Sequence, residues 1–396
     1  MFCSNQVILW GADDFNMLGL LRVLGKHDVD IFFLIKGKKG YAARSKYCKS
    51  YRETRTYQEG YDFLLSTFIK EPHKPIIITS GDGISVFIDQ HKEKLEQFFI
   101  IPGTSEKGLL ERYTDKNAMT QLAMEVGILC PESRYCQWNT NIDDVEYPCL
   151  IKPSHQKPGH YNEFKFKICK SRSELQNTLR CVRHDSEFIL QQCIQNKNDL
   201  LVYGTRLWNG RTLLAGAFIK DRHADCGSGS HGLLTANIPS CVDVDKIAAF
   251  LARIDYYGLF SFEYGLVDNE AYFFEVNLRN DGTSHYFYQA GANLPLAYVL
   301  SCAGKDYSKI RTCVQKDCWF IDELFDCENI INGTITLKQY KKDKQAATIF
   351  KYWDAEDLKP WQYMKKRRLK KMLQDMLLKR FRIYIIYVLD KFGLRK

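Results

Sequence analysis

The chain has 396 residues, of which 45% are hydrophobic and 26% charged, and its formal net charge is +9. This composition excludes a disordered or fibrous protein, and the length predicts two or three globular domains. Its apolar runs are shorter than the roughly 18 residues of a membrane span, and the N-terminus lacks the basic region of a signal peptide, so we expect a cytoplasmic protein. The 14 cysteines form no CxxC pair, which favours reduced thiols over disulfides or zinc.

The first predicted unit, residues 1–110, begins with a β-α-β pattern typical of a parallel, Rossmann-like sheet. We predict strands at 6–10, 28–35 and 75–79 and a helix at 16–25. Gly11 and Gly19 do not form a GxGxxG motif, so no dinucleotide site is expected. Ligands of open α/β sheets lie at the carboxyl ends of strands, which makes 11–14 and 80–83 candidate substrate loops, with plain turns as the alternative.

Two lysines further along the chain are placed to contact phosphate. Asp115 or Thr114 caps a predicted helix, and Lys116 lies in its first turn, where the helix dipole disfavours a cation. A phosphate contact is one reason for a lysine at that position. Lys152 ends a short buried strand beside a polar loop, which suits a contact with the α- or β-phosphate of a nucleotide. The alternative for Lys152 is a strand-end lysine in solvent.

A strand at 187–194 leads into another polar loop. The strand-edge backbone at Gln192, Cys193 and Ile194 can recognise an adenine, and the nearby carboxylate can bind ribose hydroxyls. That carboxylate is Asp199. A hairpin over 200–220 follows, and then a glycine/serine loop at 226–232. By strand periodicity the two basic residues after the hairpin share a face, and we assign them to phosphate or acyl-phosphate charge. They are Lys220 and Arg222.

The most informative stretch is 258–284, where two β-rich runs flank residues 268–270 in the pattern of a β-hairpin. With those three residues as the loop, Glu263 lies directly opposite Glu275, and Asn277 shares their face. A loop of two or four residues would instead place the two glutamates on opposite faces. The register is therefore the assumption on which this site depends.

Opposed carboxylates repel each other, so the pair predicts a cation between them. Glu263, Glu275 and the amide oxygen of Asn277 are hard ligands that suit Mg²⁺ bound to substrate phosphates. Arg279 falls on the same side and could hold a phosphoryl or carboxylate oxygen. The alternative is a solvent-facing strand edge whose acids happen to align.

The positive charge is concentrated in residues 361–396, which contain twelve Lys or Arg and two Asp, a local charge of +10. The remaining 360 residues therefore sum to about −1, and the body is nearly neutral. Apolar residues of the tail recur with helical spacing, at Leu369, Met372, Leu373, Met376 and Leu377. This pattern predicts a basic amphipathic helix that can lie on an anionic membrane. A helix packed on its own domain is an equal alternative, and nucleic acid is a weaker one.

The order of these motifs resembles the ATP-grasp superfamily over residues 5–305. The motifs are the lysine at a helix start, Ile-Lys-Pro at 151–153, Gln-Gln-Cys-Ile at 191–194, Phe-Glu-Tyr at 262–264 and Phe-Glu-Val-Asn-Leu-Arg at 274–279. The first unit, with Ser45–Tyr47 and Thr79–Asp82, resembles the carbamoyl-phosphate-synthase-like subgroup, which includes D-aspartate ligase and proteins of surface polysaccharide gene clusters. Two features depart from the family: many members carry Glu at the position of Asp199, and the loop 155–160 is less glycine-rich than many family phosphate loops, which leaves its role as a lid open.

The resemblance implies an α/β (α+β) fold. Its parts would be a Rossmann-like pre-ATP-grasp domain at 1–110, an ATP-grasp domain at 111–305 with lobes at 111–185 and 186–305, and a C-terminal cap with the basic helix at 306–396. It also implies ATP and two Mg²⁺ ions as cofactors. Glu263, Glu275 and Asn277 would hold the metal, Lys116 and Lys152 the α/β oxygens, and Arg279 with Arg222 the charge on an acyl phosphate.

The activity implied is a carboxylate–amine (or thiol) ligase that releases ADP and phosphate and acts on a cell-surface polysaccharide or peptidoglycan precursor. Its partners would be a small-molecule or glycan carboxylate and an amine, with no nucleic acid and with membrane contact through 361–396 at the cytoplasmic face. A non-catalytic MgATP-binding module anchored by the basic helix is the alternative. The sequence does not indicate the acid, the amine or the oligomeric state.

Overall fold

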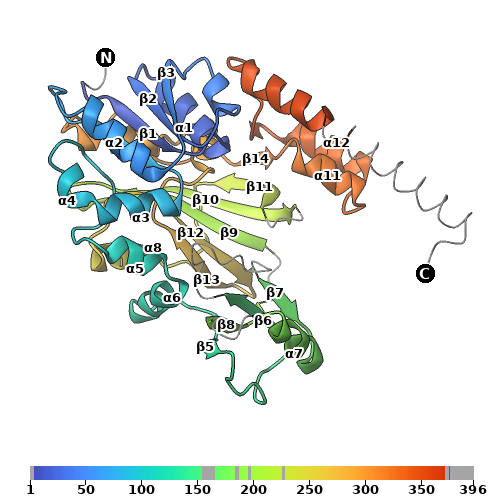
Figure 1. Cartoon of the computed structure of the whole chain (residues 1–396). Helices are drawn as coiled ribbons and strands as arrows, with labels where there is room; N and C mark the ends of the chain where they lie inside the picture. Colours follow the sequence, from blue (N-terminus) through green and yellow to red (C-terminus); the bar gives the residue numbers. More distant parts are fainter. Residues whose placement is uncertain are drawn as a thin grey trace, which may run out of the picture.

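Three β-sheets organise the structure, a computed structural model that describes residues 4–153, 166–182, 187–194, 198–224, 228–370 and 374 (Figure 1). One four-stranded sheet is parallel, a second four-stranded sheet is antiparallel, and a seven-stranded sheet lies between them. This mixture confirms the predicted α/β (α+β) class.

The N-terminal sheet is formed by apolar strands that alternate with helices. Its elements are β1 (Val7–Gly11), α1 (Phe15–Gly25), β2 (Ile31–Lys36), β3 (Ser50–Thr54), α2 (Tyr57–Thr67), β4 (Ile76–Thr79), α3 (Asp82–Gln90) and α4 (Lys92–Leu95), with the short helix η1 (Ala42–Arg44). The strand order is β3-β2-β1-β4, all parallel. β1 and β4 are fully buried, as expected for parallel strands covered on both faces. Because β1 and β4 are neighbours, loops 11–14 and 80–83 meet at one edge of the sheet.

The small antiparallel sheet has the order β5-β8-β6-β7. Its elements, with the two helices that precede them, are α5 (Leu109–Thr114), α6 (Lys116–Glu125), β5 (Ser133–Gln137), β6 (Cys149–Pro153), β7 (Lys167–Cys169), α7 (Arg172–Arg180) and β8 (Glu187–Gln192). As predicted, Asp115 caps α6, because its side chain accepts hydrogen bonds from the N–H groups of Asn117 and Ala118. Leu175 of α7 packs against Ile151 and Phe188 in the core of this lobe.

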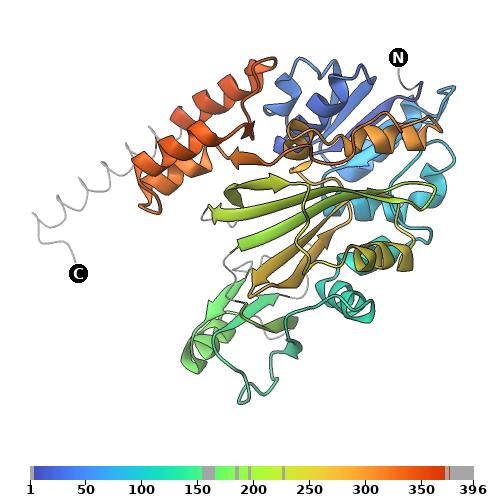
Figure 2. The same cartoon turned by 180° about the vertical axis from the view of Figure 1, so that it is seen from behind.

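The central sheet has the order β13-β12-β9-β10-β11-β14-β15. These strands and the helices between them are β9 (Asn198–Arg206), β10 (Thr212–His223), β11 (Gly229–Thr235), α8 (Val244–Arg253), β12 (Gly258–Val267), β13 (Glu270–Asn277), α9 (Ser284–Gln289), α10 (Leu294–Cys302), β14 (Cys318–Ile321) and β15 (Ile349–Phe350). Residues such as Tyr203 and Phe218 belong to a core shared with α1, α9 and α10, whereas Val202 and Phe262 pack with α6 and α8 (Figure 2). Because successive side chains of a strand point to opposite faces, both faces of this sheet are covered by helices.

The glycine/serine loop expected at 226–232 is shorter than predicted. Residues 229–232 belong to β11, where Gly232 pairs with Lys220. A Cβ on Gly232 would lie 2.4 Å from the carbonyl oxygen of Ile219, so glycine permits the close approach of the two strands. Residues 225–227 lie outside the described part of the chain.

The β12–β13 hairpin reaches the predicted register by a different route. Its turn has two residues rather than three, because Val267 pairs with Glu270 and the φ angles of Asp268 and Asn269 are 45° and 68°. The predicted three-residue loop is therefore wrong. A β-bulge at Phe274 then inserts one residue into β13, so that Glu263 still pairs with Glu275. Without the bulge, Phe274 would face Glu263.

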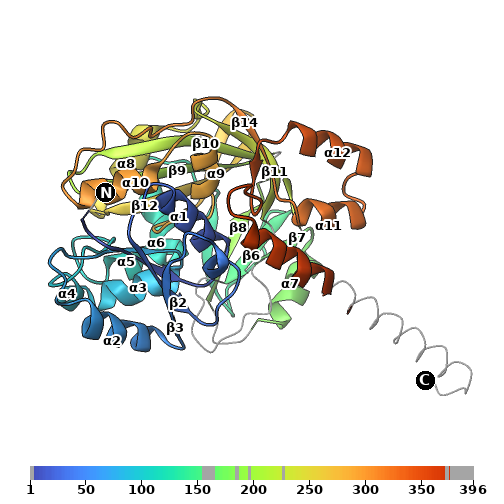
Figure 3. The ribbon, with the colours of Figure 1, turned by 90° about the horizontal axis from the view of Figure 1, so that it is seen from above.

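The C-terminal region is α11 (Phe325–Ile331), α12 (Leu337–Ala346), the two last strands of the central sheet and a helix over 358–370. β14 lies after the predicted domain boundary at 305/306, but it forms sheet hydrogen bonds with β11, which lies before it. The boundary itself stays a prediction. Trp361, Tyr363 and Met364 of the predicted amphipathic helix pack against the main core. Figure 3 shows this helix passing from beside α1 toward α11. Except for residue 374, the rest of the tail lies outside the described residues.

None of the helices in the described ranges combines the length and apolarity that a bilayer span requires.

Candidate active site

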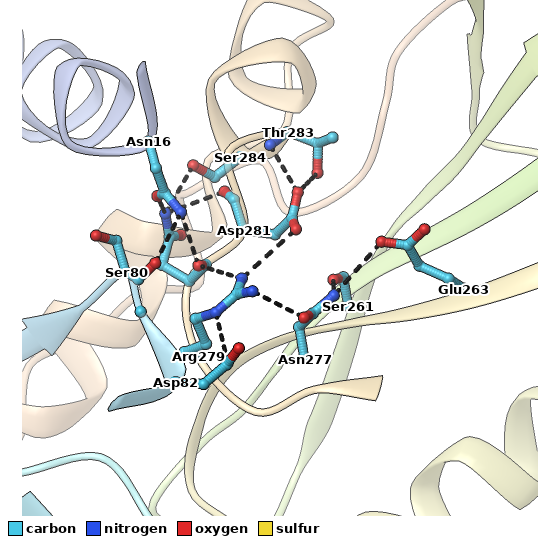
Figure 4. A network of polar contacts seen from close by, with 12 residues as sticks. Asn16, Ser80, Asp82, Ser261, Glu263, Asn277, Arg279, Asp281, Thr283 and Ser284 are labelled. Carbon is cyan, nitrogen blue, oxygen red and sulfur yellow. Dashed lines mark hydrogen bonds and ion pairs between the residues drawn. The ribbon is translucent and has the colours of Figure 1, made fainter. Parts of the chain in front are cut away.

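Glu263, Ser261 and Asn277 lie on a polar strip of the β12–β13 hairpin (Figure 4). The amide nitrogen of Asn277 donates to Ser261 Oγ at 3.2 Å and to Glu263 Oε1 at 3.4 Å. Glu275 pairs with Glu263 across the strands, and burial, together with the charge of Glu275, raises the pKa of Glu263. The predicted pairing of the two acids is therefore confirmed.

Lys220 brings a positive charge from β10 to these acids. Its Nζ lies 3.1 Å from Glu263 Oε2, and the residue is 7% exposed. Burial lowers the pKa of Lys220, but Glu263 and Asp199 together raise it above its ordinary value. Burial raises the pKa of Glu263, an effect that Lys220 opposes. The glutamate pair is half-buried, and the Glu263 side chain is 25% exposed, so the pair favours positive charge beside it.

Arg279 follows β13 and connects the hairpin to the N-terminal domain (Figure 4). Its Nη2 donates to Asn277 Oδ1 at 2.8 Å, and its Nε donates to Asp82 Oδ1 at 2.8 Å. Burial would lower the pKa of Arg279, but Asp82 and Asp281 raise it. Asp82 is the first residue of α3 and lies in the predicted substrate loop 80–83. The guanidinium is therefore oriented by groups from two elements, α3 and β13.

The turn after Arg279 is fixed against the N-terminal domain. Asn280 N–H donates to Thr79 O at 3.2 Å, and Asn16 Nδ2 donates to Asn280 O at 3.0 Å. Tyr203 OH donates to Asn280 Oδ1 at 3.0 Å from the central sheet. Because Asn280 is 1% exposed, these bonds fix the position of the segment that carries Arg279.

The two predicted phosphate lysines lie close enough to interact. Lys152, 9% exposed, donates from Nζ to Gln191 Oε1 at 3.2 Å. Burial and the charge of Lys116 lower the pKa of Lys152 to about 8, although Glu275 acts in the opposite direction. The charge of Glu275 therefore acts on Lys152, and the contacts of Lys116 and Lys152 with phosphate stay a prediction. Residues 154–165, which include the predicted lid, lie outside the described part of the chain.

The predicted adenine-binding segment has a mixed outcome. The N–H of Gln192 already donates to Glu132 O at 2.8 Å, so this donor is used within the fold. Cys193 and Ile194 follow β8 and are half-buried, and their adenine contact stays a prediction. Asp199 Oδ2 lies 2.7 Å from His223 Nε2, so the predicted ribose ligand is paired with an imidazole.

Arg222 does not join this group. Its guanidinium forms a bidentate pair with Asp326 of α11, at 2.8 and 2.6 Å, and also contacts Asp343 of α12 at 3.0 Å. A β-bulge between Lys220 and Arg222 shifts the pairing with β11, so simple strand periodicity does not apply here. The prediction that Arg222 and Lys220 act together is not supported, because Arg222 is held by the C-terminal region.

The oxygen donors present fit Mg²⁺ in their chemistry. Two carboxylates and one amide are hard ligands, and burial of Glu263 beside Glu275 disfavours two negative charges without a cation. Asn277 Oδ1 accepts from Arg279 and keeps a second lone pair. It remains a prediction that two Mg²⁺ ions bind to Glu263, Glu275 and Asn277.

Three further residues contribute to the site without having been assigned roles from the sequence. Asp82 holds Arg279, and the charge of Asp281 acts on Lys220, Glu263 and Arg279. Gln191 binds Lys152 and is 8% exposed, whereas the neighbouring Gln192 is exposed. Because side chains alternate along β8, the sequence could have shown that Gln191, and not Gln192, lies on the same face as Lys152. The contacts of Arg279 with Asp82 and of Lys220 with its acids could not be found in this way, because those acids come from segments far away in the chain.

No family model matches the chain. A curated D-aspartate ligase of Enterococcus faecium (strain Aus0004) is 25% identical over 244 residues, which cover 56% of this chain and 57% of that protein. The chain thus spans little more than half the length of this relative.

Solved structures match over more of the chain. L-amino acid ligase from Bacillus licheniformis aligns with a TM-score of 0.62 and 14% identity, covering 80% of this chain and 79% of that one. N5-carboxyaminoimidazole synthetase from Staphylococcus aureus, complexed with ADP, aligns with a TM-score of 0.65 and 12% identity, covering 83% of this chain and 85% of that one. The chain therefore has the fold of the ATP-grasp ligases.

Proposed function

We propose that the protein is an ATP-dependent carboxylate–amine ligase that works through an acyl phosphate. The observation that carries the proposal is the convergence of Glu263, Glu275 and Asn277 with Lys220 and Arg279 on one polar strip. Lys152, whose pKa responds to Glu275, supplies a second cation to the same space. Charged groups with perturbed pKa values that gather in one half-buried place are typical of functional sites.

In the proposed reaction a substrate carboxylate oxygen attacks the γ-phosphorus of ATP, and ADP leaves. The amine nitrogen then attacks the acyl carbon, phosphate leaves, and the amine loses a proton. Lys116 and Lys152 bind the α/β oxygens, and Arg279 stabilises negative charge on the acyl phosphate. Bound Mg²⁺ at Glu263, Glu275 and Asn277 would neutralise the β/γ-phosphates. The chain itself provides no covalent nucleophile in this scheme.

The names of the relatives support an amino acid as one substrate, because they are a D-aspartate ligase and an L-amino acid ligase. We further propose that the other substrate is a cell-surface polysaccharide or peptidoglycan precursor, met at the cytoplasmic face of the membrane. The basic residues of 361–396 support this location by charge.

The test is release of ADP and phosphate in the presence of Mg²⁺, measured across a panel of amino acids and uronic acids paired with amines. We expect turnover with at least one pair and loss of turnover in Glu275→Ala. Glu270→Ala is the matched control, because Glu270 lies on the same strand at its exposed end. Turnover that survives in Glu275→Ala would contradict the proposal. Tight MgATP binding without ADP formation from any mixture would favour the non-catalytic module.

A further inference from the structure

The hairpin formed by α11 and α12 directs its acids inward. Its three carboxylates, at 326, 328 and 343, are all paired with arginines. Asp326 and Asp343 lie 2.6 and 3.0 Å from Arg222 Nη2, and Glu328 pairs with Arg368. None of the three therefore offers unpaired negative charge at the surface of residues 325–346.

The basic side chains of the same region point outward. Exposed cations on α12 and on helix 358–370 are Lys338, Lys341, Lys342, Lys344, Lys359, Lys365, Lys366, Arg367 and Lys370. Helix 358–370 contains no acid. The pair between Arg368 and Glu328 joins this helix to α11, so both groups of cations belong to one part of the molecule. Figure 1 shows α11 and α12 projecting together at one end of the protein.

The connection between α11 and α12 exposes aliphatic side chains beside these cations. Ile331, the last residue of α11, is 70% exposed, and Leu337, the first residue of α12, is 54% exposed. Leu369 on helix 358–370 is 59% exposed. Aliphatic groups at a tip with lysines behind them suit the boundary of a bilayer, where apolar atoms leave water and ammonium groups meet phosphate.

We infer that the α11–α12 tip and the cationic face behind it dock on an anionic phospholipid bilayer. Ile331 and Leu337 enter the headgroup region while the lysines of α12 contact lipid phosphates. A nucleic acid would share the charge requirement, but the exposed tip is aliphatic and offers no aromatic ring for base stacking. This inference does not depend on the ligase activity. The tip and the lysines of α12 lie outside the tail at 361–396, whereas the cations at 365–370 belong to its first part.

The test is co-sedimentation of the full chain with vesicles of phosphatidylcholine, with and without phosphatidylglycerol. We expect binding only to the anionic vesicles, weakened by salt. In Lys341→Glu/Lys342→Glu the affinity should fall at least about tenfold, because each basic residue near an anionic surface contributes to attraction. Ile331→Ser/Leu337→Ser should weaken binding without changing its salt dependence.

Matched controls come from the exposed surface of the N-terminal domain. Lys70→Glu/Lys94→Glu and Ile69→Ser change the same residue types there and should bind like the wild type. Equal thermal unfolding temperatures of all variants would exclude misfolding as a cause. The inference is overturned if the wild type ignores anionic vesicles, if both hairpin variants bind as well as the wild type, or if a DNA duplex binds more tightly than the vesicles at equal salt.

Discussion

Arg279 Nε lies 2.8 Å from Asp82 Oδ1, so a carboxylate of the N-terminal domain holds the arginine that follows the glutamate hairpin. The two residues are 197 positions apart in the chain. The Arg279 side chain is 17% exposed, and its other donors reach Asn277 and Asn280. The orientation of Arg279, which we propose binds the acyl phosphate, is thus set by contacts with both α3 and β13.

Asp82→Asn should lower kcat of the proposed ligase with little effect on stability. The amide removes the charge that orients the guanidinium, and a misplacement of about 1 Å can cost about 100-fold in rate. Steady-state ADP release measures the loss, and urea unfolding measures stability. Glu71→Gln, an exposed change in the same domain, is the control. An unchanged kcat in Asp82→Asn would show that Arg279 does not need this partner.

MgATP affinity should decline as the pH rises through about 8. Burial and Lys116 lower the pKa of Lys152 to about 8, so Lys152 is charged below that pH and neutral above it. Since phosphate binds the charged form, affinity should be constant below the pKa and fall by up to about tenfold per pH unit above it. Calorimetric titration over this range measures the effect. Lys152→Met should bind weakly at every pH, whereas the exposed Lys167→Met should keep the wild-type profile. A decline that persists in Lys152→Met would assign the titration to another group.

Arg222→Met should destabilise the protein by about 3–5 kcal/mol, because it leaves a buried carboxylate without its partner. That carboxylate is Asp326, which is fully buried. Denaturant unfolding gives the free energy, with the exposed Arg211→Met as control. A stable Arg222→Met protein with a large loss of kcat would restore the catalytic role predicted from the sequence.

Asp357→Ala should weaken the contact between the C-terminal region and the N-terminal domain. Asp357 accepts from Arg22 Nε at 3.0 Å, Ser45 Oγ at 2.7 Å and Lys46 N at 2.9 Å, and Arg22 is fully buried. The remaining carboxylate, Asp354, lies 3.9 Å from Arg22 Nε, so loss of the closer Asp357 should cost about 3 kcal/mol of unfolding free energy.

The neighbouring Glu356 provides the control for that change. Its side chain is 62% exposed and pairs with Lys26, so Glu356→Ala should cost at most about 1 kcal/mol. Urea unfolding compares the two variants. Similar losses for Asp357→Ala and Glu356→Ala would contradict a buried anchor at Arg22.

The sequence by itself determined the features that depend on local pattern. Apolar runs placed β1, β2 and β4, and Asp115 indicated the start of α6 with Lys116 in its first turn. Strand alternation and the turn signal at 268–270 located the hairpin, but they did not fix its register, because the predicted three-residue loop is wrong and Glu263 faces Glu275 through a two-residue turn and a bulge. Such signals act within a few residues, so they can be read without knowing what packs against them.

The tertiary structure decided which charges meet. It gave the hairpin a two-residue turn and a bulge at Phe274, paired Arg222 with Asp326 of α11, and brought Asp82 to Arg279. The bulge and the two pairings depend on neighbouring strands or on segments far away in the chain. A carboxylate has the same local pattern whether it binds a metal, neutralises an arginine or faces water, and only packing selects among these by setting its distance to each partner and its exposure to solvent.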